Sequence, residues 1–315
     1  MHTLSVDIGG TFTDCVAIDS STGTITTAKV LTTPDDLQRG VFGGVDQIAG
    51  ELGISTAALL ASTQRFVHAT TQSSNAVFAG TGARTAVVTT RGFGDTLLIM
   101  RATGRVAGLS VFERHHYRNT QKPEPVVDER DIYEIAERVD HKGAVLTPLD
   151  ENELRAVAAR IHAAGYKAIA LCFLFAHKNS VHENQAAAVL RAELPDCYVS
   201  ISSQVAPVIG EYERSATTLF NAYVGTVIEG YLSRLEESLA AAGLAQPLLI
   251  VQANGGVATA AQTVPIMTVE SGPAAGVVGA GLLAEQLGFE NVIATDVGGT
   301  TFKVSVIAEG AWSHS

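Results

Sequence analysis

The chain has 315 residues, of which 46% are hydrophobic and 17% charged, so a sizeable core can form and wholesale disorder is excluded. Acidic residues outnumber basic ones by 32 to 21, and the formal net charge of −11 disfavours a general nucleic-acid binder. No apolar run reaches the roughly 18 residues of a membrane span, the N-terminus does not resemble a signal peptide, and the three cysteines lack metal-type spacing. These features predict a soluble, cytoplasmic α/β protein without a membrane or nucleic-acid partner.

The first third of the chain predicts a meander of strands followed by a helix. Alternating apolar residues and turn signals predict strands over 3–7, 12–19 and 24–31. The Pro34-Asp35-Asp36 run is typical of a helix start, and we expect that helix to end at Leu52 before Gly53. A short strand over 66–70, a helix over 72–79 and a strand over 85–90 follow.

Residues 91–142 carry more charge and proline, and we interpret them as an irregular excursion or small subdomain. Beyond them, Asp150 and Glu153 predict a helix N-cap, with the helix ending at Gly165. The remaining elements alternate as α/β proteins do. We expect strands at 168–174, 198–202, 248–252, 292–296 and 301–308, and helices at 182–194, 211–242 and 273–287.

The strongest signal is a repeated glycine hairpin. VDIGGTFTDCVAI, residues 6–18, matches TDVGGTTFKVSVI, residues 295–307, and each pairs a strand-end aspartate with Gly-Gly-Thr. Glycines permit positive φ and a close ligand approach, and successive N–H groups can donate to phosphate oxygens. Asp7 and Asp296 can hold Mg²⁺ or orient a nucleophile. The repeat therefore predicts a two-sided polyphosphate clamp, with two purely structural hairpins as the alternative.

A dinucleotide-binding fingerprint is a competing interpretation. Residues 279–284, GAGLLA, fit G-x-G-x-x-A, and Asp296 follows at a suitable distance. This alternative requires 276–278 to form a strand.

Two further segments hold candidate substrate residues. His68, Thr70, Thr71 and Asn75 surround a strand end and a helix start that could bind an anion, although Thr71 could equally be a simple N-cap. Glu211, Glu213 and Arg214 open the long helix, where acids are favoured by the helix dipole alone. The basic residues between Arg101 and Arg118 could steer an acidic ligand or a partner subunit, or form a solvated loop.

Motifs spread along the chain resemble the hydantoinase A/5-oxoprolinase family, which includes ATP-dependent acetone and acetophenone carboxylase subunits. The resembling stretches are VDIGGTFTD (6–14), HATTQSSNAV (68–77), VVTTRGFGD (87–95), ERVDHKGAVLTPLD (137–150), CFLFAHKN (172–179), EYERSATTLFNAYV (211–224), PLLIVQANGGV (247–257), ESGPAAGVVGA (270–280) and DVGGTTFKV (296–304).

The resemblance implies an actin, sugar-kinase and heat-shock-chaperone type of ATPase fold, a mixed sheet with flanking helices in ribonuclease-H-like lobes. It implies ATP and Mg²⁺ as cofactors, with Asp7 and Asp296 as catalytic and metal-binding residues. The nucleotide-binding residues it implies are Gly9, Gly10, Thr11, Phe12, Thr13, Gly298, Gly299, Thr300, Thr301 and Lys303. The activity it implies is phosphorylation of a carbonyl or enol oxygen, for ring-amide hydrolysis or ketone carboxylation, together with a hydantoinase B-like partner subunit.

The resemblance also implies a domain plan. We expect the first part of the first lobe with phosphate loop 1 at 1–90, the excursion at 91–142, the rest of that lobe at 143–290, and the start of the second lobe with phosphate loop 2 at 291–315. Family subunits are about twice as long, so most of the second lobe is expected to be missing, and the chain to act with that lobe or with partner subunits. Lys303 stands where the family often has aspartate, which slightly favours the carboxylase branch. A non-catalytic assembly or regulatory module is the alternative.

Overall fold

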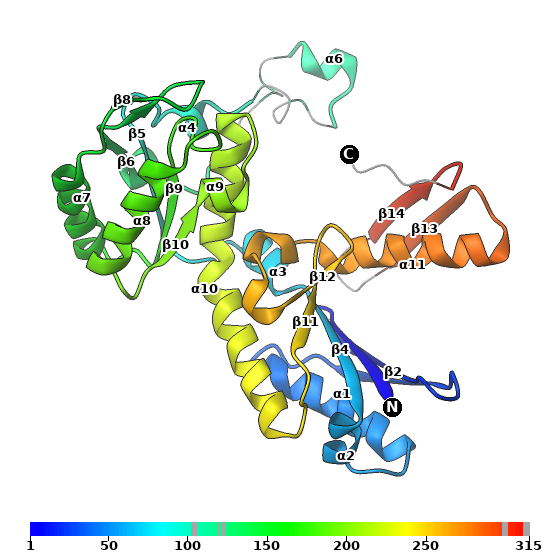
Figure 1. Ribbon diagram of the computed structural model, residues 1–315. Helices are drawn as coiled ribbons and strands as arrows, with labels where there is room; N and C mark the ends of the chain where they lie inside the picture. The colour runs from blue at the N-terminus through cyan, green and yellow to red at the C-terminus, as the bar shows by residue number, and fades with distance from the viewer. Residues whose placement is uncertain are drawn as a thin grey trace. The chain divides into compact units, whose positions relative to one another are not determined.

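The computed structural model describes residues 1–101, 106, 108–116, 118, 120, 124–297 and 302–310 (Figure 1). The chain forms two compact units: unit 1 comprises Met1–Gly80 and Val227–Ser315, and unit 2 comprises Thr81–Thr226. Within the described residues, no helix is both long and apolar enough to cross a membrane. The domain boundaries expected at residues 90, 142 and 290 remain predictions.

Unit 1 is built on a six-stranded mixed sheet in the order β12-β11-β4-β1-β2-β3. Strands β1, β2 and β3 form the antiparallel meander, β4 and β11 run parallel to β1, and β12 is antiparallel to β11. Their bounds are β1 His2–Ile8, β2 Phe12–Asp19, β3 Ile25–Leu31, β4 Thr63–Thr70, β11 Leu248–Val251 and β12 Val257–Thr259. The parallel pairing of β1 with β4 brings their carboxyl ends, Ile8 and Thr70, side by side.

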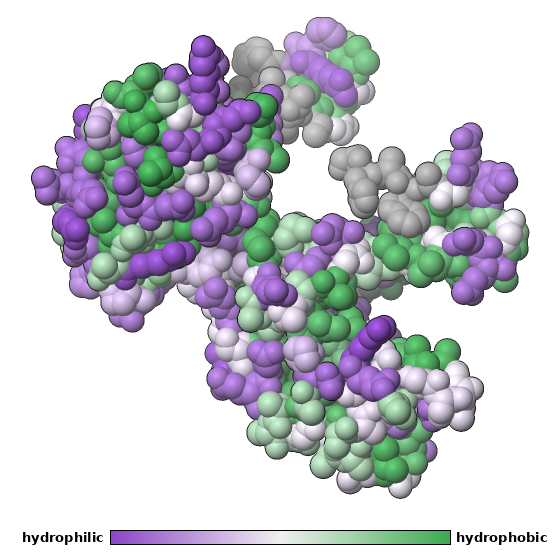
Figure 2. Space-filling view, viewed as in Figure 1, coloured by the Kyte–Doolittle hydropathy of each residue, from purple (hydrophilic) through white to green (hydrophobic). Residues whose placement is uncertain are grey.

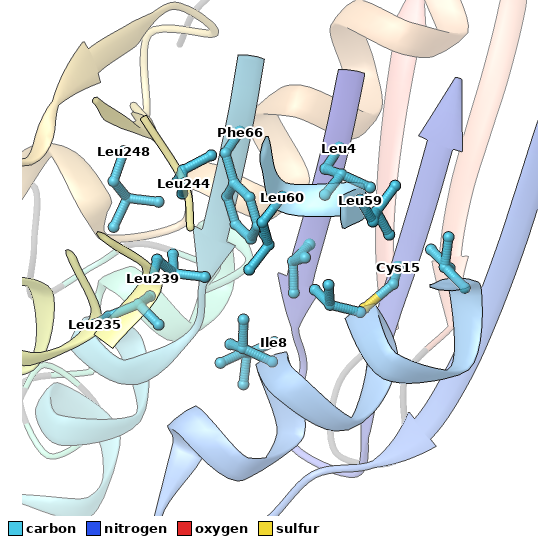
Figure 3. Close-up of a cluster of buried hydrophobic side chains, with 14 of the residues drawn as sticks. Leu4, Ile8, Cys15, Leu59, Leu60, Phe66, Leu235, Leu239, Leu244 and Leu248 are labelled. Carbon is cyan, nitrogen blue, oxygen red and sulfur yellow. The ribbon is translucent and has the colours of Figure 1, made fainter. Parts of the chain in front are cut away.

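One face of this sheet is covered by α1 (Leu37–Glu51), α2 (Thr56–Ala61) and the second half of α10 (Glu211–Ala241). The apolar residues of β1 point into this core, where Leu4, Ile8 and Phe66 meet leucines of α2 and α10 (Figure 3). Glycines let α1 approach β2 closely. A Cβ atom added to Gly44 would lie 2.1 Å from Cys15 Sγ, and one added to Gly40 would lie 2.9 Å from Thr13 Oγ1.

On β1 the opposite face of the sheet carries Thr3, Ser5 and Asp7, because successive side chains of a strand point to opposite faces, and on β2 it carries Asp14 among apolar residues. In the strand register, Asp7 lies directly opposite Asp14 on β2, and Asp14 lies directly opposite Lys29 on β3. We call this surface the Asp7 face.

Three further elements complete unit 1. Helix α3 (Gln72–Ala79) follows β4, and helix α11 (Ser271–Leu287) follows the 3₁₀ turns η3 (Ala260–Gln262) and η4 (Pro265–Thr268) and packs against β4 and β11. The hairpin of β13 (Val292–Val297) and β14 (Phe302–Ile307) packs against α11. Hydrophobic residues are exposed on α11 and this hairpin, among them Leu282, Leu287, Ile293 and Phe302 (Figure 2).

Unit 2 is built on a four-stranded parallel sheet in the order β10-β9-β5-β6, packed against α7 and α8. Its strands are β5 Thr85–Thr90, β6 Ile132–Ile135, β9 Ala168–Cys172 and β10 Tyr198–Ile201, with the small hairpin β7 Arg138–Val139 and β8 Val145–Thr147. Its helices are α4 Thr96–Ile99, α6 Val111–Arg114, η2 Glu129–Asp131, α7 Glu151–Ala163, α8 Val181–Glu193, α9 Ser202–Val205 and the first half of α10.

Most predicted elements are confirmed within a few residues, and β2, α3 and β5 have the expected bounds. Asp150 is the N-cap of α7, since its side chain accepts from Glu153 N. The elements that were not predicted include α2, strand β6 inside the segment interpreted as irregular, the short strands β7, β8 and β12, and the short helices α4, α6 and α9. The dinucleotide fingerprint is wrong, because residues 279–284 lie within α11 and no strand–turn–helix unit precedes them.

Candidate phosphate-binding site

Asp7 lies one residue before the end of β1, on the Asp7 face. Asp7, Asp14 and Lys29 lie side by side on β1, β2 and β3. The Lys29 ammonium forms an ion pair with Asp14 at 2.6 Å, so Asp7 has no ion-pair partner on these three strands. Its side chain reaches solvent, yet the surrounding elements displace much of its water. This desolvation, and then the charges of Asp14 and Asp296, raise the pKa of Asp7. A divalent cation would relieve this repulsion.

The turn after β1 places backbone next to Asp7. Gly9 N donates to Phe12 O at 2.9 Å, which closes the hairpin, and Thr32 Oγ1 donates to Gly9 O at 2.9 Å. Gly9 does not use the positive φ expected for this turn; it is needed because a Cβ atom there would lie 3.0 Å from Phe12 O. Gly10 and Thr11, at the tip, are exposed. The tip is therefore open to a ligand.

The last two residues of the predicted phosphate loop, Phe12 and Thr13, point to opposite faces of the sheet. Thr13 is fully buried on the α1 side of the sheet, where its Oγ1 lies 3.2 Å from Thr32 Oγ1. Phe12 is partly exposed, and the Lys29 ammonium lies 5.1 Å from its ring centroid. Thr13 therefore shapes the loop from beneath, and Phe12 belongs to the Asp7 face.

Helix α3 begins beside the same turn. Thr71 N and Oγ1 both donate to Ile8 O at 3.2 Å, so the start of α3 is fastened to the end of β1. Thr71 is the N-cap residue of α3, as the alternative interpretation held, although its side chain accepts no hydrogen bond from a backbone N–H of the helix. Asn75 is exposed and donates to Thr71 Oγ1 at 3.2 Å. The positive end of α3 thus lies next to the hairpin.

His68 and Thr70 are buried beneath this surface. The His68 ring is fully buried, with Nδ1 3.1 Å from Val6 O and Nε2 2.9 Å from the Tyr231 hydroxyl. Burial lowers the pKa of His68 to about 4, so the imidazole is neutral at physiological pH. Thr70 Oγ1 accepts from Gln72 N. Both residues support the strand end from inside the fold.

The start of α11 also reaches Asp7, which the sequence analysis did not anticipate. A Cβ atom added to Gly272 would lie 3.9 Å from Asp7 Oδ1. Glu270, just before the helix, has a left-handed backbone with φ of 57°, and its carboxylate pairs with Lys303 at 2.7 Å. Asp14 was also missed. A two-residue turn at Gly10 and Thr11 places Gly9 opposite Phe12, and two residues further along each strand Asp7 lies opposite Asp14, so the sequence alone could have identified Asp14.

The second hairpin contributes Asp296 and Lys303, which face each other across β13 and β14. Asp296 raises and Lys303 lowers the pKa of Asp7, so both charges act on it. Lys303 is largely covered and bound to Glu270 rather than free. The predicted residues Gly298, Gly299, Thr300 and Thr301 lie outside the described residues.

The remaining two candidates lie in unit 2. Glu213 is exposed and pairs with Arg101 at 2.5 Å. Arg214 is fully buried, donates from Nη2 to Phe173 O at 2.8 Å, and has its Nη1 2.7 Å from His177 Nδ1. Burial, and then the positive charges of Arg214 and Lys178, lower the pKa of His177.

No cluster of three or more His, Cys, Asp or Glu that could hold a metal ion occurs among the described residues. Mg²⁺ is commonly held by one or two carboxylates, with water and phosphate oxygens completing the shell. Asp7, with Asp296 acting on it, fits that donor set. The site as described can therefore offer one or two carboxylates, open backbone and two helix N-termini to a magnesium-bound polyphosphate.

Comparison with known proteins agrees with this architecture. The profile of the hydantoinase/oxoprolinase N-terminal region matches residues 3–194, and that of hydantoinase/oxoprolinase matches residues 214–315. The chain is 32% identical to the acetophenone carboxylase gamma subunit of Aromatoleum aromaticum over 99% of its length and 43% of the relative. It is 32% identical to the caprolactamase alpha subunit of Pseudomonas jessenii over 100% of its length and 44% of that protein.

A solved structure of nucleotide-free acetone carboxylase, from work on the mechanism of ATP-dependent acetone carboxylation, superposes with a TM-score of 0.91 at 26% identity. It covers 98% of this chain, which spans 44% of that one. The chain thus spans less than half the length of these relatives. The expected ATPase fold, a mixed sheet with flanking helices, is confirmed by this superposition. Because a family profile matches well over half of the sequence, the chain belongs to the hydantoinase/oxoprolinase family.

Proposed function

We propose that this chain binds the phosphates of Mg²⁺-ATP on the Asp7 face of unit 1. The observation that carries the proposal is the position of Asp7, beside an open glycine turn and the start of α3. Backbone N–H groups at such a turn are suited to phosphate oxygens, and the positive end of the nearby helix adds a favourable field. The ATP dependence named for acetone carboxylation by a relative supports the choice of nucleotide.

In this proposal, Asp7 holds Mg²⁺ directly or through water, and Asp296 approaches the same ion from the second hairpin. Gly9, Gly10 and Thr11 receive the β- and γ-phosphates, with Phe12 and Thr13 fixing the loop. The second Gly-Gly-Thr loop, residues 298–301, is assigned to the same phosphates in this proposal, and Lys303 is assigned to them once it is released from Glu270. Mg²⁺, when bound, neutralises the phosphate charge that builds up on the leaving ADP.

The reaction we propose is phosphoryl transfer to a substrate carbonyl or enol oxygen. The bond between the γ-phosphorus and the β,γ-bridging oxygen breaks, the substrate oxygen bonds to phosphorus, and ADP leaves with the electron pair. The phosphorylated product is then open to ring-amide hydrolysis or ketone carboxylation. Thr71 and Asn75, at the start of α3, belong to the substrate side in this scheme, and the buried His68 and Thr70 support that strand end from beneath.

A partner subunit of the hydantoinase B type forms part of the proposal, because relatives of this chain are named as subunits of carboxylases and a caprolactamase. We propose a cytoplasmic location. The exposed hydrophobic residues of α11 and the β13–β14 hairpin favour a second candidate function, a non-catalytic module that assembles with a longer partner.

Calorimetric titration of the 315-residue chain with Mg²⁺-ATP separates the two functions. Asp7→Asn is the test variant, and Asp196→Asn, an exposed carboxylate of unit 2, is the control with the same charge change. The proposal expects micromolar binding that Asp7→Asn weakens at least tenfold and Asp196→Asn leaves unchanged. No binding by the wild-type chain would contradict the nucleotide site and favour the assembly module.

A further inference from the structure

Two helices of unit 1 begin at almost the same place. Ser73 Oγ of α3 lies 2.5 Å from Thr268 Oγ1, just before α11, and Ser74 Oγ accepts from Glu270 N at 3.0 Å. The first turns of α3 and α11 are therefore tied together by two hydrogen bonds. Each helix carries a partial positive charge at this end, so the two fields add.

Helix α11 begins without a side-chain cap, whereas at the start of α3 Thr70 Oγ1 accepts from Gln72 N at 3.2 Å. The side chains of the N-cap residues, Thr71 and Glu270, accept no hydrogen bond from a backbone N–H of the helix that follows. Helix N-termini normally have their free N–H groups satisfied by such caps, by water or by a ligand. The Glu270 carboxylate is paired with Lys303 at 2.7 Å instead.

Buried polar atoms without partners mark the same place. Ser271, the first residue of α11, is 1% exposed, and no described group makes a hydrogen bond with its Oγ. Gln72, the first residue of α3, has a buried Oε1 that is likewise without a partner among the described residues. Buried polar atoms are paired in the great majority of cases, so the unpaired Ser271 hydroxyl, which can donate, points to a ligand with acceptor oxygens.

We propose that the first turns of α3 and α11 form a second anion site, which binds a phosphate group that is not part of the nucleotide. The inference rests on the proposed function in one respect, since it places this phosphate next to the Asp7-bound magnesium. The closeness of Gly272 to Asp7 Oδ1 supports that placement. The backbone of the β1–β2 turn then binds the nucleotide, and the first turns of α3 and α11 bind the phosphate on the side of the substrate that accepts the phosphoryl group.

The ligand class follows from the donors. Two converging helix N-termini and a serine hydroxyl suit a compact oxyanion with several acceptor oxygens. In the proposed reaction that oxyanion is the phosphoryl group after its transfer to the substrate oxygen, or inorganic phosphate released from it. Both sources present the same tetrahedral group, so inorganic phosphate is a suitable probe.

The test is calorimetric titration of the 315-residue chain with inorganic phosphate, with and without Mg²⁺-ADP, alongside a Mg²⁺-ATP titration. Ser271→Ala is the test variant. Ser203→Ala in unit 2 is the matched control, because Ser203 Oγ is also buried without a partner among the described residues. Gln72→Glu places a fixed carboxylate at the start of α3, where it would compete with the anion.

Ser271→Ala is expected to weaken phosphate binding about tenfold, as befits the loss of a hydrogen bond to a charged group. Gln72→Glu is expected to weaken it at least as much, and Ser203→Ala to leave it within twofold. Circular dichroism confirms that each variant is folded. A source test compares the two conditions: phosphate that binds only with Mg²⁺-ADP identifies the transferred group, and phosphate that binds without it identifies a free-phosphate site.

Two results would overturn the inference. One is phosphate binding that all three variants leave unchanged. The other is no phosphate binding under either condition; if Ser271→Ala then weakens Mg²⁺-ATP binding about tenfold, these donors belong to the nucleotide. Failure of the proposed function has a different signature: the chain would bind phosphate in a Ser271-dependent way but not bind Mg²⁺-ATP.

Discussion

The contact between Gly44 and Cys15 gives the sharpest test of how α1 holds the strand that carries Asp14. Gly43 and Gly44 are neighbours in α1, yet a Cβ atom would find nothing within 4 Å at Gly43 and would lie 2.1 Å from Cys15 Sγ at Gly44. Replacing a helix-interior glycine by alanine gains about 0.8–1 kcal/mol from helix propensity. Gly43→Ala should therefore stabilise the chain by about that amount.

Gly44→Ala receives the same propensity gain but overpacks the core, which typically costs about 1–3 kcal/mol. Because the gain in helix propensity is the same in both variants, their free energies of unfolding should differ by the overpacking cost alone, about 1–3 kcal/mol. Guanidinium denaturation followed by circular dichroism measures it. Adding Cys15→Ala to Gly44→Ala removes the clashing sulfur and should recover part of the loss, measured as a coupling energy against Cys15→Ala alone. Equal stability of Gly43→Ala and Gly44→Ala would refute this packing of α1 on β2.

Three further predictions concern charge and burial. Burial and the Asp14 charge raise the pKa of Asp7, so its carboxylate is less stable in the folded chain than in the unfolded one, and Asp7→Asn should stabilise the nucleotide-free chain by about 0.2–1 kcal/mol in thermal unfolding; a clear loss of stability would contradict the Asp7–Asp14 repulsion. The pKa of His68, lowered to about 4, predicts stability that is present above pH 6.5 and lost as the pH falls toward 4; His68→Phe should flatten this part of the pH profile, and an unchanged slope would speak against a buried neutral imidazole. The buried Glu183 carboxylate accepts hydrogen bonds from Phe173 N, Ser202 Oγ and Ser203 N. Glu183→Gln presents an NH₂ group to one of these donors, so it should lower the free energy of unfolding by about 1–3 kcal/mol and increase hydrogen exchange in β10. Unchanged exchange in β10 would refute the role of these three hydrogen bonds.

Local signals in the sequence were enough for most of the individual elements. The alternation of residues in β2 and the Asp150 N-cap of α7 are local features, and both were predicted correctly. Helix α2 has six residues and strand β6 has four. Both are too short for a hydrophobic periodicity that stands out in the sequence, so neither was predicted.

The candidate site was predictable only in part, because it is assembled by tertiary contacts. The glycine hairpin pointed to Asp7 from the sequence, and the parallel pairing of β1 with β4 accounts for the closeness of Thr71. Nothing local in Ser271 or Gly272 signals that α11 begins next to Asp7. The burial of Thr13 and His68 likewise depends on α1 and α10, which lie elsewhere in the sequence.

The central claim, that the carboxyl ends of β1 and β4 form a phosphate site, is tested most directly by hydrogen–deuterium exchange of the chain with and without Mg²⁺-ATP. The account predicts that the nucleotide slows exchange in peptides covering residues 7–14 and 70–76, and that Asp7→Asn abolishes this effect. Peptides of β9 and β10 in unit 2 should exchange as before. Protection confined to unit 2, or no protection of residues 7–14 at saturating nucleotide, would contradict the claim.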